Sequence, residues 1–138
     1  ELSPMLFNQH LVPWLTKLAA KFPKKVGYYS KGTQAPHIDV QLAKDSNWAG
    51  LGFDHRWDMK RVLEIPTTGF KQGNFDQALL FSEPDVFRTR VKEYLKPLQD
   101  ISPEQRKGWV CGLGHGVLPK TPEENVREFV QIVRKTFA

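Results

Sequence analysis

The chain has 138 residues, of which 40% are hydrophobic and 25% are charged, and these proportions are typical of one compact globular unit. No stretch approaches the roughly 20 apolar residues that a membrane-spanning helix needs, and the N-terminus lacks a signal-peptide pattern, so we expect neither a membrane protein nor a secretory leader. The single cysteine, Cys111, excludes an internal disulfide and fits a reducing compartment.

The charge balance is basic. Twenty basic and 15 acidic residues give a formal net charge of +5, which is compatible with an anionic partner such as a nucleic acid or a polycarboxylate. The charged residues are scattered, and many fall on predicted helices, which is typical of a solvated surface. The aromatic residues fall on helix faces or inside predicted strands, and no nucleic-acid-binding motif is present. We therefore expect no nucleic-acid partner.

The first part of the chain predicts two helices and two strands. A helix begins at Ser3-Pro4, because serine can cap free N–H groups and proline suits the first turn, and Pro13 breaks or kinks it. A strand over 26–30, a short helix over 36–44 and a strand over 48–54 follow. The first helix is expected to bury a face made of Leu6, Phe7, Leu11, Trp14, Leu15, Leu18 and Phe22.

The second part repeats this alternation. We expect a helix over 58–65, a strand over 69–74, a helical turn over 76–81 and a longer helix from 82, then an irregular segment over 97–107 and a strand over 109–113. The last helix is predicted by Thr121-Pro122-Glu123-Glu124, which matches a capping box. The inward residues are expected to be Val86, Phe87, Val91, Tyr94 and Leu95 on the longer helix, and Val126, Phe129, Val130, Val133 and Phe137 on the last.

The order of elements predicts the fold class. One helix followed by four strand–helix units is typical of an α/β protein with parallel β-α-β units. Four units are about half of a (β/α)₈ TIM-type barrel, so we expect about four parallel strands alternating with helices. The chain also opens without an initiator methionine. We interpret residues 1–138 as a single partial domain of a larger protein.

Three of the predicted strands end in a polar residue close to glycine, namely Asp54, Asn74 and His115. Because parallel strands bring their carboxyl ends to the same edge, these side chains predict a ligand site there. Asp, Asn and Gly also favour turns, so each residue taken singly has a structural alternative. His115 lies between two glycines at a strand end, which is a poor place for core packing, and we favour a functional role for it.

Other chemistries find weaker support. The glycines of Gly112-x-Gly114-x-Gly116 resemble a phosphate cradle, but Val117-Leu118-Pro119 separates them from the next helix. Zinc needs three or four ligands at suitable spacing, and the chain has no second cysteine, so we expect no metal site. Cys111 is expected to be a small buried apolar residue of the last strand.

Three segments carry a resemblance to a known family. Residues 112–126, Gly-Leu-Gly-His-Gly-Val-Leu-Pro-Lys-Thr-Pro-Glu-Glu-Asn-Val, closely resemble the C-terminal motif of the uroporphyrinogen decarboxylases. Gln72-Gly-Asn-Phe-Asp76 is similar to the family's Gln-Gly-Asn-Leu-Asp segment, and Gly50-Leu-Gly-Phe-Asp54 to its Gly-Leu-Asp strand end. Leu2-Ser3-Pro4 with Phe7 resembles the helix after the strand that carries the family's Asp-Ser pair. The resemblance is collinear over the whole chain.

The resemblance implies that this chain is the C-terminal part, roughly two-fifths, of a (β/α)₈ barrel enzyme. The family works as a cytoplasmic homodimer without metal or organic cofactor. It removes the four acetate carboxyl groups of uroporphyrinogen III and gives coproporphyrinogen III for haem and chlorophyll synthesis. His115 falls on the family's active-site histidine, which contacts the anionic tetrapyrrole at the barrel mouth. Asp54 and Asn74 are expected to support the site there.

The implied chemistry needs no cofactor. A pyrrole protonated on carbon can itself take up the electrons left by the departing carboxylate, so the protein supplies a proton donor, cations for the carboxylates and groups that hold the pyrrole N–H. His115 suits the first or second task, and the charge of +5 suits a substrate with eight carboxylates. The family's catalytic aspartate, paired arginines and tyrosine have no matching position here. We therefore expect this chain alone to be inactive.

Two residues depart from the family pattern. His55 stands where the family often has tryptophan, and Gly112 stands where it often has asparagine. Two other functions remain open, a zinc-dependent corrinoid methyltransferase on the same barrel and a non-catalytic binding or assembly module. A half barrel has open strand edges, so we expect pairing with another chain.

Overall fold

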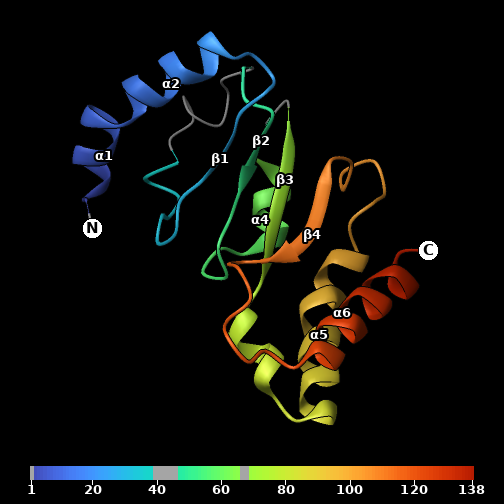
Figure 1. Ribbon diagram of the computed structural model, residues 1–138. Coiled ribbons are helices and arrows are strands. Elements are labelled where there is room, and N and C mark those ends of the chain that lie inside the picture. The colour runs from blue at the N-terminus through green and yellow to red at the C-terminus, as the bar shows by residue number, and fades with distance from the viewer. Residues whose placement is uncertain (1, 39–46, 66–68) are drawn as a thin grey trace.

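The computed structural model describes residues 2–38, 47–65 and 69–138, and four strands within them form one parallel sheet in the order β1-β2-β3-β4 (Figure 1). The strands are β1 (Gly27–Tyr29), β2 (Gly50–Gly52), β3 (Phe70–Phe75) and β4 (Trp109–Leu113). The helices are α1 (Pro4–His10), α2 (Val12–Lys21), α4 (Met59–Glu64), the 3₁₀-helix η1 (Gln77–Phe81), α5 (Pro84–Gln99) and α6 (Glu123–Thr136). This confirms the α/β class with four parallel strands alternating with helices, as in half of a TIM-type barrel.

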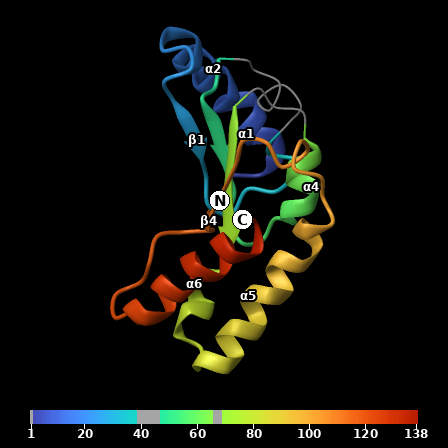
Figure 2. The same cartoon turned by 90° about the vertical axis from the view of Figure 1, so that its right-hand side faces the viewer.

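The sheet has one covered face and one open face. Figure 2 shows α1, α2, α4 and α5 on one side of the strands. On the other side, Tyr29, Gln72 and Val110 occupy the same level of the register, with Gly52 between Tyr29 and Gln72. All three side chains are exposed, so the concave side of this half barrel is accessible to a ligand.

The covered face carries two hydrophobic clusters. The first joins the sheet to α2, α4 and the end of α5, and includes Ala19, Leu51, Phe53, Val62 and Leu98. The second joins β3 and β4 to η1, α5 and α6, and includes Phe75, Leu80, Phe87, Val91 and Phe129. The ring of Phe75 stacks on that of Phe129 with centroids 5.0 Å apart. Because aromatic rings bury large areas, these contacts fix the strand ends relative to α5 and α6.

The N-terminal helix divides as expected near Pro13, but its packing differs from the prediction. Leu11 ends α1 and begins α2, because Pro13 has no N–H to continue the helical ladder. In the expected apolar face, Phe7 is buried and Leu15 packs against the first hydrophobic cluster, but Leu6, Trp14, Leu18 and Phe22 are exposed, Trp14 to 69%. Val12 and Ala19 are buried instead. The prediction was therefore correct for Phe7, whereas Trp14 and Leu18 of α2 point outward.

Two boundaries also differ from the sequence prediction. Helix α5 continues through Pro97 to Gln99, where an irregular segment was expected. The capping box before α6 does not form, since the Thr121 hydroxyl donates to the carbonyl oxygen of Leu118 at 2.6 Å and the helix has no side-chain cap. Val86 and Val130, both expected to face inward, are exposed.

The remaining elements agree closely with the predictions. Asp58 and Asp76 cap α4 and η1 through their side chains, as expected for aspartates at helix starts. Of the predicted helix 36–44, residues 36–38 form a turn and bend, and the rest lies outside the described residues. None of the helices in the described ranges has the length and apolar character that crossing a bilayer requires.

Candidate active site

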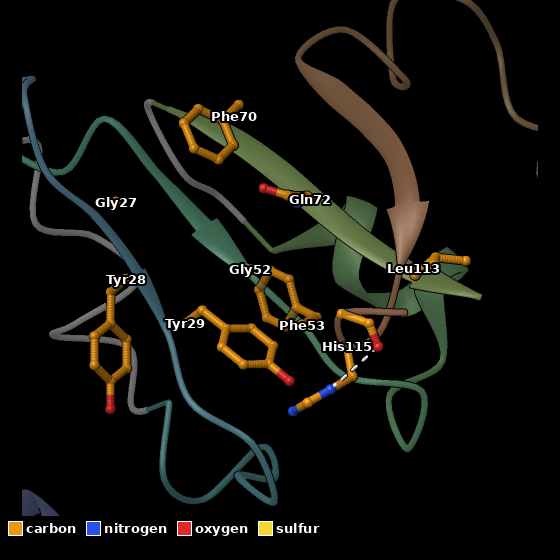
Figure 3. A pocket seen from close by; sticks show the side chains of 10 residues that line it. Gly27, Tyr28, Tyr29, Gly52, Phe53, Phe70, Gln72, Leu113 and His115 are labelled. Carbon is orange, nitrogen blue, oxygen red and sulfur yellow. Dashed lines mark hydrogen bonds between the residues drawn. The ribbon is translucent and has the colours of Figure 1, made fainter. Parts of the chain in front are cut away.

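A cavity of about 410 Å³ opens on the uncovered face of the sheet (Figure 3). It is lined by Gly27, Tyr28, Tyr29, Gly52, Phe53, Phe70, Gln72, Leu113, His115 and Gly116. These residues come from all four strands and from the loop after β4. The lining extends from Gly27 and Phe70, the first residues of β1 and β3, to His115 beyond the carboxyl end of β4.

Aromatic rings and glycine shape the wall of this cavity. The Tyr29 ring lies against Gly52 of the neighbouring strand, where a Cβ atom would approach Tyr29 Cβ to 3.1 Å. Glycine at position 52 therefore lets the ring lie flat on the sheet. Among the lining residues, all of them in the described part of the chain, there is no lysine or arginine. Such a wall suits the flat, largely apolar face of a ring system.

His115 lies two residues beyond the end of β4 on the rim of the cavity (Figure 3). Its side chain is exposed. Within the described residues, its ring makes one long hydrogen-bond contact, between Nδ1 and the carbonyl oxygen of Gly116 at 3.4 Å. The imidazole is therefore available to bind an anionic group or to exchange a proton with a ligand.

Asp54 lies just beyond the end of β2, and its carboxylate is fully engaged inside the protein. The side chain is 1% exposed. One oxygen accepts from the Gly32 amide at 2.6 Å and from the Arg56 guanidinium at 2.8 Å, and the other accepts from the Arg56 amide at 2.9 Å. Burial alone would raise the pKa of Asp54, but these hydrogen bonds and the Arg56 charge outweigh it and lower the pKa.

Asn74 lies on β3 and is also engaged internally. Its amide nitrogen donates to the carbonyl oxygens of Asp54 at 2.8 Å and Trp57 at 2.6 Å. Its backbone N–H donates to the hydroxyl of Tyr94 at 2.9 Å. The side chain is 3% exposed, so it holds the segment after β2 against β3.

The three sequence-predicted residues therefore lie at one edge of the sheet but differ in what they contact. The Asn74 amide contacts the Asp54 backbone directly, and neither residue lines the cavity that includes His115. The sequence analysis did not single out Tyr29 or Gln72, which do line it. Successive side chains of a strand point to opposite faces of the sheet, and this alternation places Tyr29 of β1 and Gln72 of β3 on the open face.

Cys111 faces the helices, where it packs on the second hydrophobic cluster. Burial raises the pKa of its thiol to about 12, and the Tyr94 hydroxyl only partly offsets this. Across the described ranges, no three His, Cys, Asp or Glu side chains come together as a metal-binding group would require. The zinc-dependent alternative therefore finds no support at Cys111.

The two positions that depart from the family pattern lie close to this edge. Nδ1 of His55 is buried and has no hydrogen-bond partner among the described residues. Gly112 lies in β4 beside Gln72, and a Cβ atom there would be 3.9 Å from the Gln72 side chain. Position 112 therefore has room for a larger residue.

Comparison with known proteins identifies the family. The family model described as "Uroporphyrinogen decarboxylase (URO-D)" matches residues 1–136. The chain belongs to the uroporphyrinogen decarboxylase family. The collinear resemblance of its motifs to this family is thereby confirmed.

Individual relatives agree with this membership. A uroporphyrinogen decarboxylase of Thermus thermophilus is 30% identical over 99% of this chain and 39% of the relative. Those of Solibacter usitatus and Chlamydia trachomatis are 37% and 42% identical over 62% and 56% of this chain, and over 24% and 22% of the relatives. The chain thus spans about two-fifths of the length of the Thermus thermophilus relative.

Proposed function

We propose that this chain forms the His115-bearing part of a uroporphyrinogen decarboxylase active site. The parent enzyme would remove the four acetate carboxyl groups of uroporphyrinogen III as carbon dioxide and give coproporphyrinogen III. The observation that carries the proposal is the free imidazole of His115 on the rim of an aromatic cavity, at the edge where four parallel strands end. Family membership supplies the reaction class.

The chemistry divides between the substrate and the protein. When a pyrrole carbon is protonated, the bond between the acetate methylene and its carboxylate can break, with its electron pair moving into the ring as carbon dioxide leaves. A proton then adds to the methylene carbon to give a methyl group, and the proton on the ring carbon is released, which restores the aromatic pyrrole. His115 is placed to carry such a proton or to bind a carboxylate, while the flat wall around Tyr29 and Phe70 faces the ring system.

We also propose that the chain alone does not turn over substrate. The described lining of the cavity contains no lysine or arginine, although the substrate carries eight carboxylates. Those carboxylates require cations from outside this lining. Turnover by the isolated chain, measured by chromatography of the porphyrin products, would contradict this part of the proposal.

The test of the function uses a fusion. The chain is joined to the part of the Thermus thermophilus relative that precedes the matched residues, and coproporphyrinogen formation is followed. We expect activity in the fusion and a loss of about 10²- to 10⁴-fold with His115→Asn, because a positioned proton carrier contributes that much. His10→Asn is the matched control, since His10 lies on α1 outside the cavity and should leave the rate unchanged.

A second experiment addresses the non-catalytic alternative. Uroporphyrin III, the fluorescent oxidised form of the substrate, is titrated into the isolated chain and into His115→Ala. We expect affinity in the unsubstituted chain and a loss of several-fold in the variant, because His115 is the basic side chain of the lining. Unchanged binding by His115→Ala would favour a module that binds porphyrin without the histidine.

We also propose the cellular compartment and the oligomeric state of the parent enzyme. The resemblance supports a parent enzyme that works in the cytoplasm as a homodimer without metal or organic cofactor. In the described sheet, β1 and β4 are the outer strands, each paired on one side only. Such edges favour pairing with another chain, and light scattering that shows a strict monomer at high concentration would count against it.

A further inference from the structure

The backbone of Gly114, directly before His115, is the point where the ends of the strands meet. Its N–H donates to the carbonyl oxygen of Phe75 at the end of β3, at 2.7 Å. A Cβ atom on Gly114 would collide with the backbone nitrogen of His55, beyond β2, and would come within 3.1 Å of the Asn74 carbonyl oxygen. Glycine at this position therefore lets the loop pack directly on two neighbouring strand ends.

Tyr29 attaches the loop after β4 at a third point, from β1 at the opposite edge of the sheet. Its hydroxyl donates to the carbonyl oxygen of Gly114 at 2.8 Å, across 85 positions of sequence. The side chain starts on β1, lies against Gly52 and reaches the loop after β4, so it spans the cavity (Figure 3). Burial raises the pKa of Tyr29 and the charge of Asp54 adds to this, so the hydroxyl remains a donor.

The His115 ring itself lacks a comparable support. Within the described residues, it is held by the 3.4 Å approach of Nδ1 to the Gly116 carbonyl oxygen, which is at the long limit for a hydrogen bond. Catalytic histidines are usually oriented by a hydrogen bond to one ring nitrogen. Here the direction of the ring depends on the backbone that carries it.

We propose that Tyr29 is a positioning residue for His115, acting through the Gly114 carbonyl oxygen. The hydroxyl closes the loop onto β1, while the ring remains part of the cavity wall. The inference deepens the proposed function and rests on it for the role of His115. The physical link between Tyr29 and the loop can be tested without any substrate.

The test compares Tyr29→Phe with Tyr28→Phe in the full chain. Phenylalanine keeps the ring and removes the hydroxyl, so Tyr29→Phe should fold. Tyr28 is the adjacent residue of β1, its side chain packs against the first hydrophobic cluster, and Tyr28→Phe serves as the matched control for folding and exchange. Amide hydrogen exchange at Gly114 and the order parameter of the His115 ring by NMR relaxation are measured in both variants.

We expect Tyr29→Phe to speed exchange of the Gly114 amide about fivefold, the factor that one neutral hydrogen bond supplies. The Phe53 amide, which donates to Gln72 within the sheet, reports any global loss of stability and should not change by that factor. The His115 ring should become more mobile in Tyr29→Phe alone. If Tyr29→Phe and Tyr28→Phe give the same values at Gly114 and His115, the proposal is overturned.

Titration with uroporphyrin III separates this inference from the function it rests on. Weaker binding by Tyr29→Phe supports the positioning role if binding by Thr89→Val is unchanged, because the Thr89 hydroxyl bonds within α5 and lies outside the cavity. If the unsubstituted chain binds no uroporphyrin III, the proposed function loses support, and the exchange experiment still decides whether Tyr29 holds the loop.

Discussion

Two neighbouring regions of the same sheet edge use polar side chains in opposite ways. At the ends of β2 and β3, the side chains of Asp54 and Asn74 are buried and bonded to the protein. In the loop after β4, the imidazole of His115 is exposed and makes one long contact. A polar side chain at a strand end therefore stabilises the fold where it is buried and hydrogen-bonded, and it can contact a ligand where it is exposed.

The largest effect is expected from Asn74→Ala. The variant removes both donors to the buried carbonyl oxygens of Asp54 and Trp57, so the free energy of unfolding should fall by about 3 kcal/mol. Urea unfolding followed by circular dichroism measures it. Asn8→Ala is the control, because the Asn8 amide bonds an exposed carbonyl and should cost under about 1 kcal/mol. Equal effects of the two variants would mean that Asn74 does not hold the strand ends.

Asp54→Asn is expected to cost about 2 kcal/mol near neutral pH, because an amide N–H would face the donors of Gly32 and Arg56. The pKa of Asp54 in the folded protein lies below its ordinary value of 3.8. Its ionised form therefore stabilises the protein above that pH, and this contribution is lost as the pH falls through the lowered pKa.

The measurement for Asp54 is the difference in unfolding free energy between the two proteins as a function of pH. The difference should be constant from neutral pH down toward 4 and should shrink below that. A difference that stays constant at lower pH would contradict the lowered pKa.

Gly112→Asn is expected to change stability by about 1 kcal/mol or less, because the position has room beside Gln72 and Gly112 does not adopt a positive φ. The variant introduces asparagine, the residue that the resemblance to the family leads us to expect at this position. Thermal unfolding measures the effect. Precipitation or a large drop in the melting temperature would show that the described space beside Gln72 is not available to a side chain.

The smallest effect on stability is expected from His115→Ala, within about 0.5 kcal/mol, since the ring is exposed and makes one long contact. The same variant should weaken binding of uroporphyrin III. A loss of stability as large as that of Asn74→Ala would place His115 among the structural residues and would remove the contrast between the two regions.

Sequence patterns anticipated the elements better than their packing. The alternation of strand and helix, the break near Pro13 and the helix starts near Asp58 and Asp76 depend on neighbouring residues, so they could be predicted. The outward direction of Trp14 depends on which neighbour covers α2, and the extension of α5 through Pro97 depends on the packing of its last turn on the core. Neither is a local property.

In the candidate site, too, the position of each residue along the chain could be predicted, whereas its contacts could not. The sequence alone determined that Asp54, Asn74 and His115 lie at the ends of strands, because the spacing of apolar residues and glycines sets where each strand stops. Only the tertiary structure decided which of them is enclosed, because a hydrogen bond such as that from Gly32 to Asp54 or from Tyr29 to Gly114 joins residues far apart in the chain. Such partners become neighbours only when the strands pair, so no local pattern encodes them.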